Sequence, residues 1–517
     1  MSRDIMRLSL DELSGSVFDV AIVGAGINGA ETARCLSAAG YSVLLVDKSD
    51  FAAGASGRSS RLLHCGLRYL APGKSVWEFV RQPQRFLTAC RMARAAMQSR
   101  AQFVRDTPDR IRSMRFCFPV YRGGPYSGWQ IDAAFRILKS LGGREVPLNY
   151  RRLSGAEVAQ MPLLQHLRDK QALQSVAMFD EYQFDWPERV VVDAVLEAQR
   201  LGASVRNYTE VTHAAQQGDL WQLELGDTLD AAARPVHVVA RSVFNMGGIW
   251  IDRINARVEA GRIGRRITGT KGVHIVVRLP PECSRFGIAT LNRLNEGLYC
   301  IPWRGLHYFG PTETLYHGDP DDIHPTEEDF EFLLGEANHL LPTLDIKRSD
   351  ILYGWAGVRP LTYDPAQPMG ARSRQLHDFG PEGAPNLFAM TAGPIMSHRS
   401  AGQLALTALG KGLAPSRPSQ QPDFASRSVP RETGNSSRED KLSIMQRGVE
   451  SEHAETIDDL LVRRSGLVWN DDPLGEDVDL AVEVLAKARS WSAQRKRQEA
   501  ASAREAIAHR LHIDPPA

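Results

Sequence analysis

The sequence predicts an α/β protein in which a doubly wound, Rossmann-like nucleotide-binding domain carries a cap built on an antiparallel sheet and is followed by a helical domain. Three observations predict this class. A strand–helix–strand unit opens the chain over residues 18–46, short alternating apolar runs fill residues 272–314, and residues 442–512 are rich in Ala, Glu, Arg and Leu. The opening unit is typical of a parallel sheet with helices on both faces.

The opening unit has clear boundaries. Residues 18–23 are mostly β-formers and lead directly into glycine, as buried parallel strands do. An alanine-rich helix is expected over residues 29–39, where Gly40 ends it, and a second apolar strand over residues 41–46. This arrangement places the turn between strand and helix at the edge of the sheet where nucleotides bind.

Further elements follow along the chain. Residues 77–106 predict a long, basic, amphipathic helix or helix pair, and residues 190–201 predict another helix. Strands are expected at residues 204–211 and 238–245. The alternating runs of residues 272–314 predict the antiparallel sheet of the cap.

Composition divides the chain into domains. Four prolines among Ser, Gln and Arg indicate a flexible linker over residues 413–441, and residues 442–517 then form the C-terminal helical domain. Residues 1–412 hold two interleaved domains. We assign about 16–75, 190–255 and 350–412 to the nucleotide-binding domain, and about 76–189 and 256–349 to the substrate or cap domain.

Composition also excludes several classes of protein. The 62 Lys and Arg residues nearly balance the 61 Asp and Glu residues, so we expect no nucleic-acid partner. None of the six cysteines forms a CxxC pair, so we expect no metal site of that spacing and a reducing compartment. We see no long apolar span and no signal-peptide core, which predicts a cytoplasmic protein that can still lie on a membrane surface.

The first turn carries a nucleotide fingerprint, because residues 24–29 match GxGxxG. Gly24 permits the tight turn, Gly26 lets the backbone approach a pyrophosphate, and Gly29 lets the helix pack against the strand. Asp47 ends the second strand, where its carboxylate can accept both hydroxyls of an adenosine ribose and would repel a 2′-phosphate. FAD or NAD is therefore favoured over NADP.

The following stretch favours FAD. Residues 50–61 are dense in small and hydroxyl side chains, which suits a loop along a ribityl–pyrophosphate chain, although a solvated Ser/Gly loop has the same composition. Four motifs occur in this region: Gly26-x-Asn28-Gly29, Asp50-Phe51-Ala52-x-Gly54-x-Ser56, Arg58-Ser59-Ser60 and Leu63-His64-x-Gly66-Leu67-Arg68-Tyr69-Leu70. On these motifs, residues 18–70 resemble the FAD-dependent (aerobic, respiratory) glycerol-3-phosphate dehydrogenases of the D-amino-acid-oxidase-like flavoprotein superfamily.

The resemblance continues over nearly the whole chain. Residues 271–277 are similar to the family's Lys-Gly-Ser-His-Ile segment, and residues 356–361 to its Ala-Gly-Val-Arg-Pro-Leu motif, which a Ser-Arg pair at 373–374 follows. Residues 245–250 resemble a second nucleotide-domain strand and turn, and residues 456–464 the opening of the family's helical domain.

The resemblance implies a reaction and its partners. The family oxidises sn-glycerol 3-phosphate to dihydroxyacetone phosphate, with hydride passing from C2 to flavin N5 and electrons to a quinone. It implies FAD as cofactor, a phosphorylated polyol as substrate and a peripheral position on the cytoplasmic face of the inner membrane. The Arg-rich residues 81–115 and 257–271 could face anionic lipid, or could be solvated surfaces. The electron acceptor could also be oxygen or a soluble carrier.

The resemblance also implies site residues. Arg359 and Arg374 are the phosphate candidates, because guanidinium groups match phosphate oxygens, with Arg68 nearer the substrate hydroxyls. His274 is the candidate base or substrate ligand, and Tyr69 donates to a substrate oxygen or walls the flavin. The expected cofactor contacts are Gly24, Gly26, Asn28, Gly29, Asp47, Ser56, Arg58, Ser59, Ser60, His64, Val211, Gly247 and Gly393.

Two positions depart from the family pattern. Pro394 replaces the lysine of Gly-Gly-Lys, which removes a positive charge expected beside flavin and substrate, and Cys65 replaces a glycine. The lost charge could be supplied by Arg372, His398 or Arg399. The departure leaves two alternatives: a diverged FAD-dependent oxidase or dehydrogenase of another hydroxy or amino compound, and a flavin-binding protein with little catalysis. For Cys65 the alternatives are a small buried side chain and covalent flavin attachment.

Overall fold

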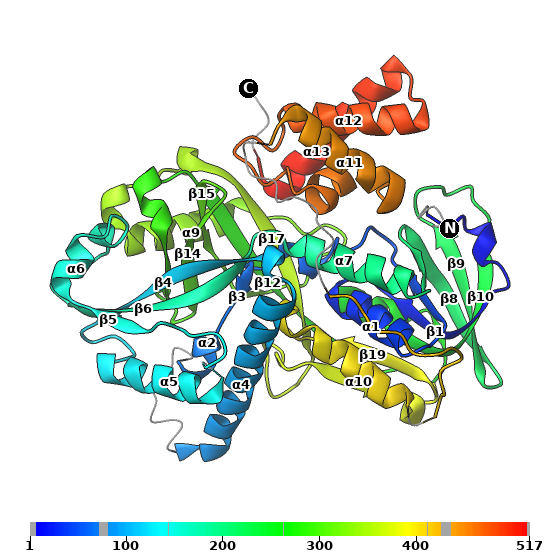
Figure 1. Cartoon of the computed structure of the whole chain (residues 1–517), viewed down its shortest axis with the longest axis horizontal. Helices are drawn as coiled ribbons and strands as arrows, with labels where there is room; N and C mark the ends of the chain where they lie inside the picture. The colour runs from blue at the N-terminus through cyan, green and yellow to red at the C-terminus, as the bar shows by residue number, and fades with distance from the viewer. Residues whose placement is uncertain are drawn as a thin grey trace.

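The computed structural model describes residues 7–71, 81–142, 144–261, 263–410, 412–424 and 436–513. Figure 1 shows three parts: a nucleotide-binding part around α1, α7 and α10, a cap around β4, β6 and α4–α6, and a group of C-terminal helices that packs above both. The α/β class with a Rossmann-like sheet, a second sheet and a helical C-terminus is confirmed.

The nucleotide-binding sheet has five parallel strands at its centre. In spatial order they are β7 (Ser204–Arg206), β2 (Val43–Val46), β1 (Val17–Val23), β10 (Val236–Asn245) and β19 (Leu387–Thr391). The helices of this domain are α1 (Ile27–Ala38), α7 (Pro187–Arg200) and α10 (Arg399–Leu409), and α1 packs against both of the others. The carboxyl ends of β1, β2 and β10 meet at one edge, which is the edge where ligands of such sheets bind.

The prediction of a single strand at residues 204–211 is wrong. The chain forms two strands there, β7 and β8 (Thr209–Gln217), which lie at different places in the sheet. Tyr208 between them has a φ of 49°, a left-handed conformation that ends a strand. β8 instead joins an antiparallel extension with β9 (Leu220–Asp227), and the short strands β11 (Val258–Glu259) and β18 (Gln375–Asp378) complete the sheet.

The cap sheet is mostly antiparallel, as expected. Its long strands are β4 (Ile111–Tyr121), β6 (Leu173–Phe184), β12 (Ile267–Val277) and β17 (Ile351–Thr362), and its shorter ones β3 (Leu62–Leu63), β5 (Arg151–Leu153), β13 (Phe286–Leu291), β14 (Gly297–Trp303), β15 (Leu306–Gly310) and β16 (Thr314–Leu315). One pair, β13 with β4, is parallel. β17 lies in a segment that we had assigned to the nucleotide domain, but it pairs along its full length with β12 and so belongs to the cap sheet.

Helices cover the cap. They are α2 (Leu67–Leu70), α4 (Pro83–Asp106), α5 (Gly128–Leu141), α6 (Gly155–Ala159) and α9 (Glu327–Leu340). The part of the predicted 77–106 helix that falls within the described residues 81–106 contains one long helix, α4, and residues 77–80 lie outside them. No helix among the described residues is long and apolar enough to cross a membrane.

The C-terminal part is helical, as expected, and begins slightly earlier, at residue 438. It contains α11 (Arg438–Ser451), a π-helix (Asp459–Arg464), α12 (Glu476–Arg489) and α13 (Ala493–Leu511). The described beginning of the expected flexible linker is attached rather than free: the backbone N–H groups of Arg417 and Gln420 donate to the carbonyls of Gly40 and Ala38. Residues 425–435 of that linker lie outside the described residues.

Candidate functional site

One large cavity lies between the two sheets. It has a volume of about 1420 Å³ and runs from the first turn of the nucleotide domain to the facing strands β12 and β17 of the cap. Ligand pockets usually measure about 300–1,000 Å³, so this cavity has room for a large cofactor together with a small substrate.

The glycines of the first turn are required by packing. Gly24 has a φ of +107°, and a Cβ there would lie 2.7 Å from the carbonyl carbon of Met246 on β10. A Cβ on Gly29 would lie 1.8 Å from the carbonyl oxygen of Gly24. The N-terminus of α1 therefore approaches the sheet edge closely, with Gly26 and Asn28 lining the cavity. The free N–H groups of a helix N-terminus are a general anion site.

Asp47 closes the nucleotide end of the cavity. Its carboxylate accepts the N–H of Ala25 at 2.7 Å and the N–H of Ser49 at 2.8 Å, so its orientation is fixed. Burial raises the pKa of Asp47 to about 6. Val211 and Gly247 line the cavity with it.

The Ser-rich loop follows the cavity from this end toward the cap. Ser56, Ser59 and Ser60 line the cavity, and the Ser56 hydroxyl accepts the N–H of Ile27 at 3.0 Å. Arg58 also belongs to the lining, but its guanidinium donates to the carbonyl of Ile323 at 3.0 Å. The structure therefore engages the charged end of Arg58 with a loop of the cap rather than offering it to a cofactor.

His274 lies on β12 at the centre of the cavity wall. Its side chain is buried, its Nε2 lies 3.0 Å from the Ser60 hydroxyl, and its ring stacks on Trp355 with a centroid distance of 4.6 Å. Burial and the nearby guanidinium groups of Arg359 and Arg61 hold its pKa well below the ordinary value. The imidazole is therefore neutral near pH 7 and keeps a lone pair that can accept a proton.

Three arginines line the cavity near His274: Arg68, Arg359 and Arg372. The pKa of Arg359 is lowered to about 10 by burial and by the positive charges of Arg372 and Arg68, whereas Glu313 raises it. The two arginines therefore repel Arg359. Arg372 pairs with Glu313, while Nη1 of Arg359 is buried and has no hydrogen-bond partner among the described residues. The Glu313 carboxylate offsets one of the three guanidinium charges, and the remaining positive charge suits an anion.

Arg374 does not belong to this wall. Its guanidinium donates to the Ser397 carbonyl at 2.8 Å, to Oδ1 of Asn28 at 3.2 Å and to the Pro394 carbonyl at 3.4 Å. It packs flat beneath Gly393, where a Cβ would lie 2.6 Å from its Cζ. The structure thus corrects the expectation that Arg374 binds phosphate: it ties the turn at Gly393 to the N-terminus of α1.

Of the three groups that could replace the missing lysine, only Arg372 reaches the cavity. His398 is buried against Arg34 and Glu31, and Arg399 pairs with Asp106, so both side chains are engaged elsewhere. Pro394 itself lines the cavity with Gly393 and begins the turn that leads into α10. Arg372 is not part of any of the family motifs. The only sequence feature that points to it as a cavity residue is its position two residues before Arg374.

The aromatic residues beside α2 form another part of the wall. His64 and Tyr69 line the cavity with their rings edge to face at a centroid distance of 5.5 Å, and burial lowers the pKa of His64 to about 3. Cys65 between them is fully buried and does not line the cavity. Its thiol pKa is raised by burial, which favours the small buried side chain over covalent flavin attachment.

Arg61 is a cavity residue that the sequence did not reveal. Its guanidinium is buried, lies 4.4 Å from the centroid of Trp303 and 4.5 Å from that of Trp469, and pairs with Glu188 at 3.1 Å. These partners come from the cap, the C-terminal part and the nucleotide domain respectively. Arg61 therefore joins the three parts directly behind the cavity, and it follows the Arg58-Ser59-Ser60 motif without a signal of its own.

Comparison with known proteins identifies the family of the chain. A family model described as FAD dependent oxidoreductase matches residues 19–414. The chain is 28% identical over 404 residues to a glycerol-3-phosphate dehydrogenase of Synechocystis, covering 76% of this chain and 70% of that one. It is 27% identical over 407 residues to an aerobic glycerol-3-phosphate dehydrogenase of Staphylococcus epidermidis, covering 77% and 67%.

Solved structures share the fold. The glycerol-3-phosphate dehydrogenase from Bacillus halodurans complexed with FAD superposes with a TM-score of 0.72 at 20% identity, covering 97% of this chain and 96% of that one. The L-alpha-glycerophosphate oxidase from Mycoplasma pneumoniae with FAD bound gives a TM-score of 0.56 at 16% identity, covering 78% and 98%. The agreement over almost the full length of the first structure includes the C-terminal helices.

Proposed function

The chain belongs to the family of FAD-dependent oxidoreductases, and from this premise we propose that it oxidises sn-glycerol 3-phosphate to dihydroxyacetone phosphate. The observation that carries the proposal is the wall of Arg68, Arg359 and Arg372 beside the neutral His274, in one cavity with the nucleotide turn. The curated relatives that match most of the chain are glycerol-3-phosphate dehydrogenases, which supports the same reaction.

The cavity fits FAD. Gly24 and Gly29 permit the close packing that brings the N-terminus of α1 to the cavity, where its N–H groups would bind a pyrophosphate. Asp47 lines the same end of the cavity and would accept the hydroxyls of a ribose. Ser56 and Ser59 are placed to follow the chain toward the cap. FAD, when bound, supplies the hydride acceptor of the reaction.

The arginine wall would hold the phosphate of the substrate. A guanidinium can donate two parallel hydrogen bonds to phosphate oxygens, and Arg359, which belongs to the cavity lining, would be such a donor. A dianionic phosphate would also relieve the repulsion among Arg68, Arg359 and Arg372, which lowers the pKa of Arg359 in its absence. An amine without an acidic group would carry its positive charge into the same positive wall, and the glycerol-3-phosphate dehydrogenases among the relatives support a phosphorylated alcohol over an amino acid.

His274 would take the proton of the C2 hydroxyl. The neutral imidazole would accept it on the ring nitrogen that carries no hydrogen, and the contact of Nε2 with the Ser60 hydroxyl at 3.0 Å orients the ring. Burial, Arg359 and Arg61 lower the pKa of His274 in the free protein, and a bound phosphate would offset the part of this shift that comes from the two guanidinium groups. Tyr69 is placed in the same cavity to donate to a substrate oxygen.

We propose a quinone at a membrane surface as the electron acceptor. The exposed face of α4 supports this, because Leu87, Arg91 and Arg94 are exposed and follow one another at helical spacings of four and three residues. Trp129 is exposed on α5, which contacts α4. Basic and apolar groups on one face suit peripheral contact with anionic lipid. The other basic segment, residues 257–271, supports it less: Arg257 pairs with Glu210, and Lys271 is buried with Asp329.

Steady-state turnover with an artificial electron acceptor tests the substrate. We expect activity on sn-glycerol 3-phosphate, with KM at least about 100-fold higher for glycerol, because glycerol lacks the group that the arginine wall binds; two charge-assisted hydrogen bonds account for that factor. Equal activity on glycine or glycerol would contradict the proposal and favour the diverged oxidase. Activity on none of them, with FAD bound, would favour the flavin-binding protein without catalysis.

A further inference from the structure

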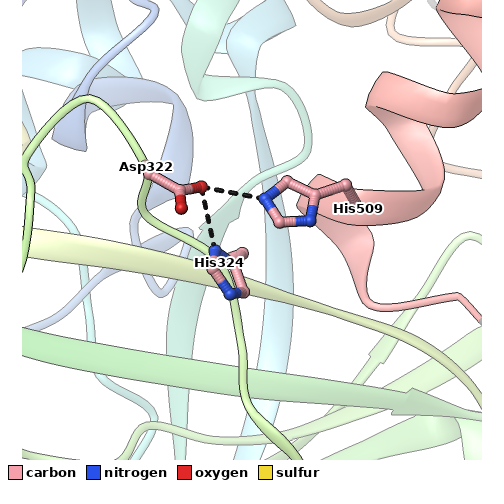
Figure 2. A group of neighbouring side chains, drawn as sticks. All are labelled: Asp322, His324 and His509. Atoms are coloured by element: carbon pink, nitrogen blue, oxygen red, sulfur yellow. Dashed lines mark hydrogen bonds and ion pairs between the residues drawn. The ribbon is translucent and has the colours of Figure 1, made fainter.

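A group of three possible metal ligands lies outside the cavity, where the cap meets the last helix. Asp322 and His324 belong to the loop between β16 and α9, and His509 belongs to α13. Figure 2 shows both imidazole rings facing one carboxylate oxygen from these two elements. Oδ1 of Asp322 lies 3.1 Å from Nδ1 of His324 and 2.8 Å from Nε2 of His509, and the two rings have a centroid distance of 4.3 Å.

We propose that Asp322, His324 and His509 form a site for one divalent transition-metal ion of the zinc type. Two imidazole nitrogens with one carboxylate oxygen are a ligand set that zinc uses, with a fourth position left for water. Bonds of about 2.0–2.1 Å in a tetrahedron place ligand atoms about 3.3 Å apart. The two separations from Oδ1 of Asp322 are close to this value, and all three ligand atoms lie within 4.8 Å of one another. Calcium and magnesium prefer six or more oxygen ligands, so a set dominated by nitrogen disfavours both.

The surroundings allow an ion to enter. The side chain of Asp322 is 59% exposed and that of His509 is 58% exposed, so a hydrated ion reaches the group without movement of the backbone. In the absence of an ion a single carboxylate is shared by two imidazoles. An ion would replace those two hydrogen bonds by coordinate bonds, and its second positive charge would be available to water or to an anionic ligand from solvent.

The ion would join two parts of the chain that are 187 residues apart. Next to the site, Asp321 lines the large cavity, where it accepts Nε1 of Trp250 at 2.7 Å and pairs with Arg253 at 3.1 Å. A metal bridge from α13 to this loop would therefore hold the C-terminal helix against the segment that borders the nucleotide end of the cavity. Its role would be structural, and the proposal does not depend on which substrate the protein oxidises.

Equilibrium dialysis of the FAD-loaded, chelator-treated full-length protein against Zn²⁺, followed by metal analysis, tests the site. We expect one Zn²⁺ per chain, and at least about 10-fold weaker binding in His509→Ala and in His324→Ala, since loss of one ligand costs at least that factor. His317→Asn, an exposed histidine before the same loop, and His512→Asn, at the end of the same helix, are matched controls that keep the affinity. Ca²⁺ in place of Zn²⁺ should not bind.

A second measurement separates a built site from scattered surface binding. Zn²⁺ should slow amide hydrogen exchange at residues 319–326 and 503–511 in the wild-type protein, and should leave exchange unchanged in His509→Ala. Because His509 is exposed on a helix and alanine favours helices, this variant is expected to fold. Undiminished Zn²⁺ binding in both ligand variants, or equal losses in the His317 control, would overturn the proposal.

Discussion

At the scale of single residues, the structure separates two arginines that the sequence treats alike. Arg359 belongs to the cavity lining, whereas Arg374 lies outside it and its two terminal nitrogens donate to Ser397, Asn28 and Pro394. A family motif predicts that an arginine occurs at a given position. The direction in which its guanidinium points depends on the packing around it, which the motif does not contain. Arg372, which no motif marks, takes the place in the wall that we had expected of Arg374.

Substitution of the arginines that line the cavity should have a different effect from substitution of Arg374. Arg359→Gln and Arg372→Gln should each lower kcat/KM for sn-glycerol 3-phosphate by about 10- to 150-fold, mainly through KM, because each removes a charge-assisted hydrogen bond worth about 1.5–3 kcal/mol. Arg374→Gln should instead weaken FAD retention and thermal stability and change KM little. Steady-state kinetics and flavin content after gel filtration measure both effects. A larger rise in KM for Arg374→Gln than for Arg359→Gln would contradict the assignment.

Substitution of His274 should lower kcat. His274→Gln keeps a hydrogen bond to Ser60 within reach but removes the base, so kcat should fall by about 10²- to 10⁴-fold, the usual contribution of general base catalysis. FAD content should stay unchanged, because the ring lies on the cap strand β12 rather than at the nucleotide turn. The control is His64→Gln, which changes a cavity histidine with no base role and should lower kcat far less. Equal losses in the two variants would remove His274 from its role.

At the scale of elements, the C-terminal helices are attached directly to the cofactor loop. The carboxylate of Asp50, three residues after Asp47, is fully buried and accepts Arg464 through both oxygens at 2.7 and 2.8 Å, Arg463 at 2.6 Å and Asn207 at 2.8 Å. These charges hold the pKa of Asp50 at about 2. The π-helix that carries both arginines thus fixes the loop that follows Asp47.

Breaking this attachment should affect both stability and the cofactor. Arg464→Gln leaves Asp50 with an incomplete set of partners in a dry site, and loss of one partner of a buried ion pair costs about 3–5 kcal/mol. We expect earlier unfolding in urea and faster loss of FAD on dialysis. Arg438→Gln, which breaks the exposed pair of Arg438 and Glu483, should cost no more than about 1 kcal/mol. Similar unfolding of the two variants would contradict the account.

Helices and strands were predictable from the sequence where the local pattern of one segment determines them. The strand–helix–strand unit at residues 17–46 follows from local pattern, and its glycines are required by contacts at Met246 and Gly24. The division at Tyr208 was not predictable, because β7 and β8 are separated by a positive φ and the chain there contacts residues far away in sequence: the N–H of Tyr208 donates to Ser49 and the side chain of Asn207 to Asp50. The assignment of β17 failed for the same reason: its partner β12 lies some eighty residues earlier, and strand pairing leaves no local trace.

At the scale of the whole molecule, buried histidines set the response to acid. Five have pKa values below the ordinary one: about 3 for His64, about 4 for His307 and His453, and well below it for His274 and His398. Four carboxyls act in the opposite sense, with pKa values raised by burial: Glu181 to about 7, Asp47 to about 6, and Glu31 and Asp459. As pH falls from 7.5 to 5, the unfolded chain binds a proton on all five imidazoles and the native protein on at most these four carboxyls.

The unfolded state therefore gains more protons, and the free energy of unfolding should fall over this range. The stability contributed by the neutral histidines is present above about pH 6.5 and is lost below it. Urea unfolding of the FAD-loaded protein at pH 7.5 and pH 5 measures the difference. His307→Gln should make the decline shallower, since it removes one of the five groups. Stability that rises toward pH 5 would contradict the proton balance.

The most direct test of the central claim is anaerobic mixing of the purified, FAD-loaded protein with sn-glycerol 3-phosphate while the visible flavin absorbance is followed. We predict rapid bleaching, slowed strongly in His274→Gln and restored at higher substrate concentration in Arg372→Gln, because the first variant lacks the base and the second binds the phosphate weakly. An oxidised flavin that dithionite still reduces, but that sn-glycerol 3-phosphate leaves unchanged, would contradict the account and would show that Arg372 does not replace the charge absent at Pro394.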